Sequence, residues 1–124
     1  MRRLLPALLI AAAACSEPLV PPDFVEPDAV AEVSGLVLKA SGAPVVAGSV
    51  NIRCANDQFG GAAPINAEGK YRALLGASAE VLGGPSGSVL CVFTAPGGIS
   101  AERTISFAPP ATPPGMQVVD LRGG

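Results

Sequence analysis

The sequence predicts an all-β protein, a seven-stranded antiparallel β-sandwich that follows a signal peptide and a proline-rich tether. Three observations favour this class. Gly (15) and Pro (13) are abundant among the 124 residues, and they are the two poorest helix formers. From residue 32 onward, short apolar runs alternate with turn residues, as in sandwiches and barrels. No amphipathic helical segment separates the runs, so the crossover helices of a parallel α/β fold are not expected.

The expected strands follow one another at short intervals, and each is flanked by Gly, Pro, Asn or Ser. They cover residues 32–39, 48–54, 62–65, 70–75, 88–94, 100–107 and 116–122. In the second of these, Val50, Ile52 and Cys54 share one face while polar residues take the other, which indicates a half-buried strand. The same alternation predicts further core-facing groups on the later strands: Tyr71 with Ala73, Val89 with Cys91 and Phe93, and Ile105 with Phe107.

The connections between these strands carry turn chemistry. Residues 66–69 predict a hairpin turn in which Gly69 takes a positive φ. Residues 56–61 are expected to form a loop, and residues 77–82 have room for one helical turn. The segment 108–115 contains four prolines, so it is expected to be a stiff crossing between strands.

Residues 1–14 have the features of a lipoprotein signal peptide. Two arginines precede an apolar run over residues 4–14, which has the length of a signal sequence and is too short to span a bilayer. The run ends in small residues before Cys15 and resembles the lipobox of bacterial lipoproteins, whose cysteine becomes the first mature residue and carries acyl chains. This resemblance implies a lipid-anchored protein of the bacterial cell envelope. Ser16, where an inner-membrane address has Asp, resembles an outer-membrane address in diderm bacteria. The alternative is an ordinary secretory signal in which Cys15 is incidental.

Residues 15–31 read as the lipidated cysteine and a tether. The tether contains four prolines, four acidic residues and no basic residue, so we expect an extended, semi-stiff spacer with a reach of roughly 50 Å. These acids account for the whole charge of the processed chain, because residues 32–124 contain six acidic and six basic side chains. Phe24 and Val25 are apolar residues within this segment. As an alternative to a role in the spacer, they could dock on the domain or on a partner.

Cys54 and Cys91 are predicted to form a disulfide. Both lie on expected strands and on the core-facing side, and an exported protein meets an oxidising environment. The alternative is two buried free cysteines. A redox pair is poorly supported, because the two residues form no Cys-x-x-Cys motif and no basic group is placed to lower a thiol pKa.

Residues 33–50 have a Val-x-Gly-x-Val strand, a Gly-Pro turn and an Ala-Gly-x-x-Val start of the next strand. Residues 66–73 are similar to an Asp-x-x-Gly-x-Tyr hairpin, with Asn66 in place of the acid. Residues 118–121 match a closing strand. Together these motifs resemble carboxypeptidase regulatory-like domains, which are prealbumin-like (transthyretin-like) β-sandwiches without catalytic activity. The resemblance covers about residues 32–122 and makes 32–124 one domain. It implies that the strands bearing Cys54 and Cys91 are neighbours in one sheet.

The composition argues against several function classes. The chain contains no His, so the commonest general base and most zinc sites are missing. Its formal charge of −2 provides no basic surface for a nucleic acid. The acids of the domain are scattered over expected loops and an outward face, and they form no recognisable catalytic pair or metal-ligand set. We therefore expect no enzyme activity, no cofactor and no metal site.

Two functions remain. The first is a monomeric, membrane-anchored structural or protein-interaction module with an envelope partner. The alternative is a small carbohydrate- or peptide-binding surface protein that uses the loop residues Asn56, Asp57, Gln58 and Phe59. The position of Phe59 distinguishes them, because an exposed ring would favour ligand binding and a ring turned to the core would make it a loop anchor. An exposed, uncharged sheet edge would instead favour addition of a partner strand.

Overall fold

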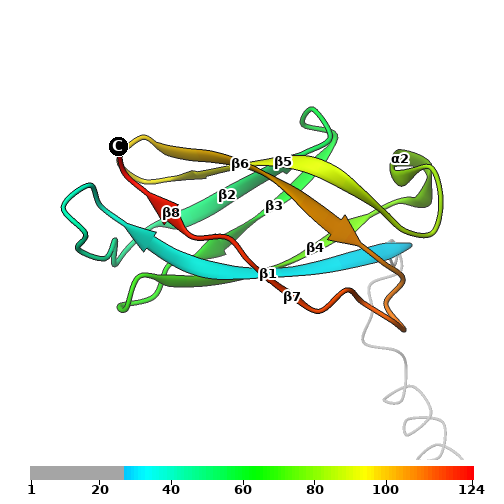
Figure 1. The fold of residues 1–124 in the computed structure, drawn as a ribbon, viewed down its shortest axis with the longest axis horizontal. Coiled ribbons are helices and arrows are strands. Elements are labelled where there is room, and N and C mark those ends of the chain that lie inside the picture. Colours follow the sequence, from blue (N-terminus) through cyan, green and yellow to red (C-terminus); the bar gives the residue numbers. More distant parts are fainter. Residues whose placement is uncertain (1–26) are drawn as a thin grey trace, which may run out of the picture.

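Two β-sheets pack face to face in the computed structural model, which describes residues 27–124 (Figure 1). One sheet has the strand order β4-β1-β7, with β8 also paired to β1, and the other has the order β3-β2-β5-β6. The predicted β-sandwich is therefore confirmed. The expected signal peptide, Cys15 and the expected tether up to residue 26 lie outside the described residues. The elements are β1 (Ala29–Leu38), β2 (Ser49–Cys54), β3 (Phe59–Pro64), β4 (Lys70–Ala77), α2 (Ala79–Leu82), β5 (Gly87–Ala95), β6 (Ile99–Phe107), β7 (Met116–Val118) and β8 (Leu121–Arg122).

Strand β1 begins at Ala29, three residues before the expected start of the first strand. Ala29 and Ala31 are fully buried, and the antiparallel pairing with β4 already starts at Ala29 opposite Ala77. The end of the expected tether therefore belongs to the sandwich. Its composition obscured this, because alanine is a weak strand former and nearby prolines and acids are typical of a spacer.

Strand β3 replaces the second half of the loop that was expected over residues 56–61 and overlaps the strand expected at 62–65. It pairs with β2 along its whole length, from Cys54 opposite Phe59 to Ser49 opposite Pro64. Two consecutive glycines made this segment resemble a loop, since glycine is depleted in strands. Pairing with the regular strand β2 overrides that weak preference, and the connecting loop shrinks to residues 55–58.

The turn at residues 66–69 has the expected geometry but does not form a hairpin. Gly69 has a φ of +80°, and the side-chain oxygen of Asn66 accepts hydrogen bonds from the backbone N–H groups of Glu68 and Lys70, both at 2.9 Å. The strands that the turn joins, β3 and β4, belong to different sheets. The turn therefore carries the chain from one layer of the sandwich to the other.

The expected closing strand, residues 116–122, is divided into β7 and β8, and both run parallel to β1. At the break between them, the backbone N–H of Val119 donates to Ser34 O at 2.8 Å. The carboxylate of Asp120 accepts from the N–H of Leu36 at 2.9 Å. The side chain of Asp120 thus takes the place of a backbone acceptor at the break between β7 and β8. The backbone of β1 therefore remains hydrogen-bonded across this break.

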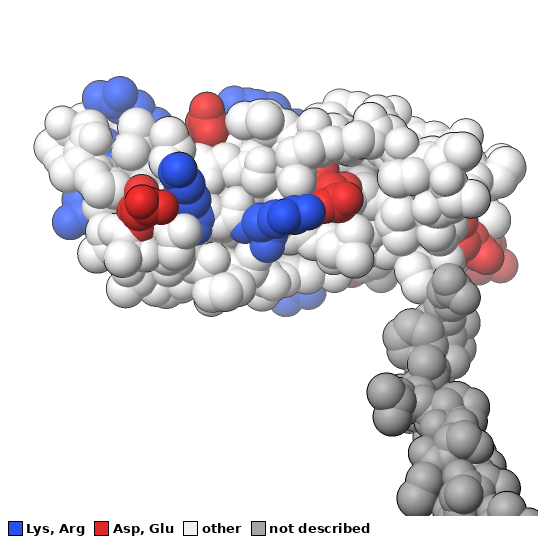
Figure 2. Space-filling model, turned by 90° about the horizontal axis from the view of Figure 1, so that it is seen from below, with Lys and Arg blue, Asp and Glu red and all other residues white. Residues whose placement is uncertain are grey.

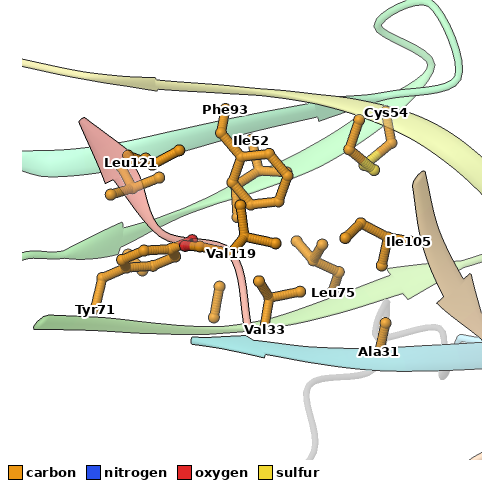
Figure 3. Close-up of a cluster of buried hydrophobic side chains, with 14 of the residues drawn as sticks. Ala31, Val33, Ile52, Cys54, Tyr71, Leu75, Phe93, Ile105, Val119 and Leu121 are labelled. Atoms are coloured by element: carbon orange, nitrogen blue, oxygen red, sulfur yellow. A yellow bond between two sulfur atoms is a disulfide. The ribbon is translucent and has the colours of Figure 1, made fainter. Parts of the chain in front are cut away.

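The core lies between the two sheets and consists of the inward residues of every long strand (Figure 3). The predicted groups are buried, including Val50, Ile52 and Cys54, which have no exposed surface, and only Val89 among them is partly buried. Residues 79–82 form the single helical turn expected in that connection, and the side chain of Ser78 caps it by accepting from Val81 N. Alternation with period two was therefore a sound guide to the buried face.

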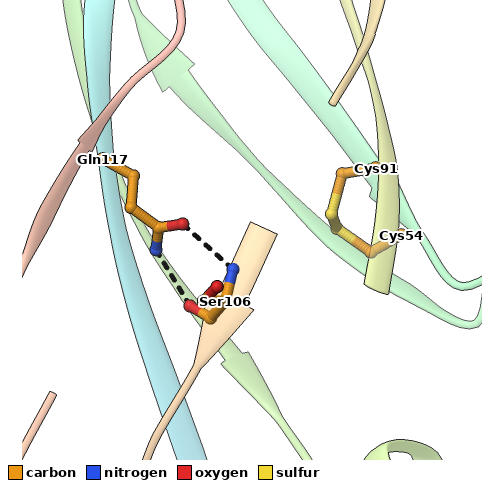
Figure 4. The surroundings of a disulfide bond; sticks show 4 residues. All are labelled: Cys54, Cys91, Ser106 and Gln117. Carbon is orange, nitrogen blue, oxygen red and sulfur yellow. Dashed lines mark hydrogen bonds between the residues drawn. A yellow bond between two sulfur atoms is a disulfide. The ribbon is translucent and has the colours of Figure 1, made fainter. Parts of the chain in front are cut away.

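Gln117 joins the two sheets at one side of the sandwich (Figure 4). Its side-chain oxygen accepts from the backbone N–H of Ser106 at 3.0 Å, and its side-chain nitrogen donates to Ser106 O at 2.9 Å. Ser106 belongs to β6 and Gln117 to β7. The amide side chain therefore pairs with the edge of β6 as the backbone of another strand would.

Replacing Gln117 with Leu is expected to lower the free energy of unfolding by about 1–2 kcal/mol, because two hydrogen bonds to Ser106 are lost. Equilibrium urea unfolding measures the change. The matched control is Gln58→Leu, because that glutamine is exposed in the loop between β2 and β3. Equal changes in the two variants would contradict a specific role for Gln117.

Candidate functional site

The predicted disulfide is present and joins β2 to β5 (Figure 4). The strands that carry Cys54 and Cys91 are neighbours in one sheet, as the family resemblance implied, and the two residues lie directly opposite each other in the antiparallel register. Both residues have no exposed surface. A reductant therefore cannot reach the sulfur atoms without opening the sandwich, which is the property of a structural crosslink and not of a redox site.

The predicted ligand loop is short and tightly wound. Ala55, Asn56 and Asp57 have φ values of 54°, 56° and 68°, so three successive residues adopt the left-handed conformation. Asn and Asp tolerate this conformation well, whereas Ala does so at a cost. Asn56, Asp57 and Gln58 are exposed. Of the four residues predicted to bind a ligand, Asn56 and Asp57 are the two that line the adjacent surface hollow of about 400 Å³.

Phe59 does not join those polar residues in an exposed site. It is the first residue of β3 and is half-buried. Its ring packs edge-on against Phe107, with 5.5 Å between ring centroids and an interplanar angle of 81°. The aromatic side chain that was the best candidate for a sugar platform therefore anchors the loop to the core.

A larger groove, of about 670 Å³, lies along the sheet that contains β4, β1 and β7. Figure 2 shows this side of the molecule, where a few charged side chains are surrounded by uncharged surface. Leu36 of β1 is among the lining residues, with Lys70 and Arg72 of β4 and with Val118 and Asp120 near β7. The groove is thus an apolar surface that has cations on β4 and an acid near β7.

The two cations of the groove are paired with acids: Arg72 with the half-buried Glu32 and Lys70 with the exposed Glu68. Arg72 is 2.6 Å from the carboxylate of Glu32, and Lys70 is 4.0 Å from that of Glu68. Both cationic side chains are largely exposed, so each pair is expected to contribute at most about 1 kcal/mol to stability. These weak pairs leave Lys70 and Arg72 available to an acidic ligand or segment.

Three large apolar side chains are exposed around the groove: Leu74 (70%), Val118 (68%) and Met116 (44%). The strand register places Leu74 and Met116 on either side of Glu32, and Val118 beside Ser34, so they share one face. No motif or turn signal in the sequence points to these three residues. For Leu74, the alternation along β4 did contain the information. Because Tyr71 and Ala73 point into the core, the residue next to them, Leu74, points to the solvent.

Tyr71 lies beneath this surface and is buried. Its hydroxyl donates to the carbonyl of Val119 at 2.6 Å. Burial, and then the negative charge of Asp120, raise the pKa of Tyr71 well above its ordinary value of 10.0, against a smaller lowering by Arg103. The phenol is therefore kept neutral and ties β4 to the break between β7 and β8.

The raised pKa of Tyr71 predicts a loss of stability above pH 10. The unfolded chain releases the phenolic proton at about pH 10 while the native state retains it, so stability is expected to fall by up to about 1.4 kcal/mol per pH unit there. Urea unfolding at a series of alkaline pH values measures this slope. Tyr71→Phe is expected to be less stable at neutral pH and to have a shallower slope, and an unchanged slope would contradict the assignment.

Among residues 27–124, no group of three or more His, Cys, Asp or Glu side chains is positioned to hold a metal ion. In the same part of the chain, every helix is too short or too polar to cross a bilayer. Comparison with protein-family models and with curated proteins found no match to this chain.

Proposed function

We propose that this protein is a non-catalytic, lipid-anchored component of the bacterial cell envelope whose β-sandwich acts as a structural or protein-interaction module. The observation that carries the proposal is the exposed face formed by Leu74, Met116 and Val118 beside the groove. Contiguous exposed apolar side chains on a domain of this size are typical of an interaction surface.

The N-terminal sequence supports the envelope location. The signal-like run over residues 4–14, the small residues before Cys15 and the acidic, proline-rich segment after it follow the pattern of a lipoprotein. Several acyl chains on Cys15 would give stable anchoring, because each buried methylene contributes about 0.8 kcal/mol. The resemblance of residues 32–122 to carboxypeptidase regulatory-like domains also supports a module without catalytic activity.

The ligand-binding alternative has weaker support at its original site. Phe59 packs against Phe107, so the loop that contains Asn56 and Asp57 has no exposed aromatic ring for a sugar. The groove beside Lys70 and Arg72 is the better place for a peptide, and binding there is a form of protein interaction.

The anchor is tested by the intact mass of the protein from a membrane fraction, together with the distribution of a Cys15→Ala variant. An acylated wild-type chain in the membrane and a variant that leaves it would support the proposal. An unacylated wild-type chain, or a variant that remains in the membrane, would overturn the lipid anchor.

The interaction face is tested with a photo-crosslinking amino acid at position 118 in the intact cell. The matched control places it at exposed Thr104 on the other sheet. A discrete protein adduct at position 118 that is absent at position 104 and is weakened by Leu74→Glu would support the proposal. Equal labelling at both positions, or no adduct at position 118, would contradict it.

A further inference from the structure

The edge of β4 presents free backbone hydrogen-bonding groups. The N–H of Val37 donates to Gly69 O at 2.8 Å. In an antiparallel pair every second residue is hydrogen-bonded to the neighbouring strand, so the odd-numbered residues of β4 are the ones that bond to β1. Arg72, Leu74 and Gly76 consequently turn their N–H and C=O groups away from β1. Within residues 27–124, β1 is the only strand that pairs with β4.

The other strand edges of the described sandwich are protected, each by a different device. On β6, the side chain of Gln117 pairs with Ser106, and the guanidinium of Arg103 donates to Glu102 O at 2.7 Å. Strands β7 and β8 have three and two residues, and β3 ends in Pro64, which has no N–H. These are the ordinary ways of blocking strand addition. In contrast, β4 is eight residues long and uncharged from Ala73 to Ala77.

The chain enters the sandwich at the C-terminal end of β4, over the outer face of the sheet, because Gly76 lies between the buried residues Leu75 and Ala77. Pro27 packs against Gly76, so closely that a Cβ added to Gly76 would lie 2.8 Å from the Cβ of Pro27. The carboxylate of Asp28 accepts from Ala79 N at 2.8 Å, which fixes the entry point at the end of β4. The residues that precede Pro27 therefore start beside Gly76, and four extended residues cover the distance back to Arg72 at about 3.3 Å per residue.

The preceding segment is complementary to β4 in charge and in hydrophobicity. Residues 16–26 contain three acids and no base, whereas β4 contains Lys70 and Arg72 and no acid. The apolar pair of this segment, Phe24 and Val25, is two to three residues from Pro27. That spacing brings it level with Leu74, whose side chain is 70% exposed.

We propose that the segment Asp23–Glu26 docks along β4 as a short added strand of its own domain. Counting back from Pro27 beside Gly76 places Val25 next to Leu74 and Asp23 next to Arg72. Pro22 and Pro27 flank the segment, and because proline has no N–H, they limit the added strand to these four residues. The docking goes beyond the proposed function and does not depend on acylation of Cys15.

Docking would control both the reach of the domain and its open edge. With Asp23–Glu26 on β4, the free tether from Cys15 to Asp23 spans about 25 Å, instead of about 37 Å from Cys15 to Pro27. Release of the segment would lengthen the reach by about 12 Å and expose the β4 edge to a strand from a partner. The N-terminal segment would then act as an intramolecular competitor of a binding partner.

Amide hydrogen exchange followed by NMR tests the docking, on the chain from residue 15 onward with Cys15→Ser. The amides of Arg72, Leu74 and Gly76 report the edge, and those of Tyr71, Ala73 and Leu75 report pairing with β1 and thus folding. We expect the edge amides to exchange at least about tenfold more slowly than free amides do. The double variant Asp23→Lys, Val25→Asp is expected to remove this protection and to leave the odd-numbered amides unchanged.

The matched control is Glu17→Lys, Leu19→Asp, which makes equivalent changes farther from Pro27 and is expected to retain protection at the edge. Unprotected edge amides in the starting chain would overturn the proposal, as would protection that persists in the Asp23→Lys, Val25→Asp variant. Each sample is also measured after tenfold dilution. Protection that decreases on dilution would assign the edge to a second copy of the chain and would likewise overturn docking within one molecule.

Discussion

Removal of the Cys54–Cys91 disulfide is expected to lower the free energy of unfolding by roughly 3–4 kcal/mol, because the crosslink closes a loop with a sequence separation of 37 and restricts the unfolded chain. A small domain has only about 5–15 kcal/mol in total, so the loss is a large part of its stability. Urea unfolding of the Cys54→Ala, Cys91→Ala variant measures it.

The control for this prediction is the wild-type chain unfolded and refolded in reductant. It is expected to have nearly the stability of the double alanine variant, and the variant itself is expected to be insensitive to reductant. A loss below about 1 kcal/mol in both cases would show that the unfolded chain gains little freedom when the crosslink is removed.

The substitution Gly35→Ala is expected to cost about 3–5 kcal/mol, because the added methyl group cannot be accommodated. A Cβ at Gly35 would lie 2.0 Å from the carbonyl oxygen of Val119 and 2.6 Å from its carbon. Val119 cannot retreat freely, since its N–H donates to Ser34 O and its carbonyl accepts from the hydroxyl of Tyr71. Thermal and urea unfolding measure the loss.

Gly84→Ala is the matched control for this close approach. The nearest atom to a Cβ at Gly84 is 3.9 Å away, so the methyl group meets only ordinary contact. We expect a change within about 0.5 kcal/mol for this surface position. A Gly35→Ala variant as stable as Gly84→Ala would show that the crossing of β1 by the segment around Val119 is looser than the structure indicates.

The parts of the fold that followed from the sequence are those with local signals. Alternation identified the buried face of β2 and of β6, and it placed Cys54 and Cys91 on the inside. The start of β1 and the first half of β3 were missed, because Ala29 and the glycines of β3 have weak strand preferences that only pairing with a regular neighbour overcomes. The parallel pairing of β7 with β1 has no local signal at all.

The candidate site was predictable only in part. The loop residues Asn56 and Asp57 were identified by their polarity, and they are exposed. The packing of Phe59 on Phe107 depends on the position of β6, which no local pattern contains. The groove combines β1, β4 and β7, and the register that brings Val118 beside Ser34 joins residues 84 positions apart. Such a surface becomes visible only when the strand order is known.

The strand order also implies a sequence of folding events. The pairs β2–β3 and β5–β6 are local hairpins that can form early, and the disulfide then joins one hairpin to the other. In the other sheet no two consecutive strands pair with each other, and Glu32 of β1 must wait for Met116, which emerges 84 residues later. Such distant pairing slows folding. A chain with this topology is expected to complete the sheet around β1 only after nearly the whole sequence has been synthesised.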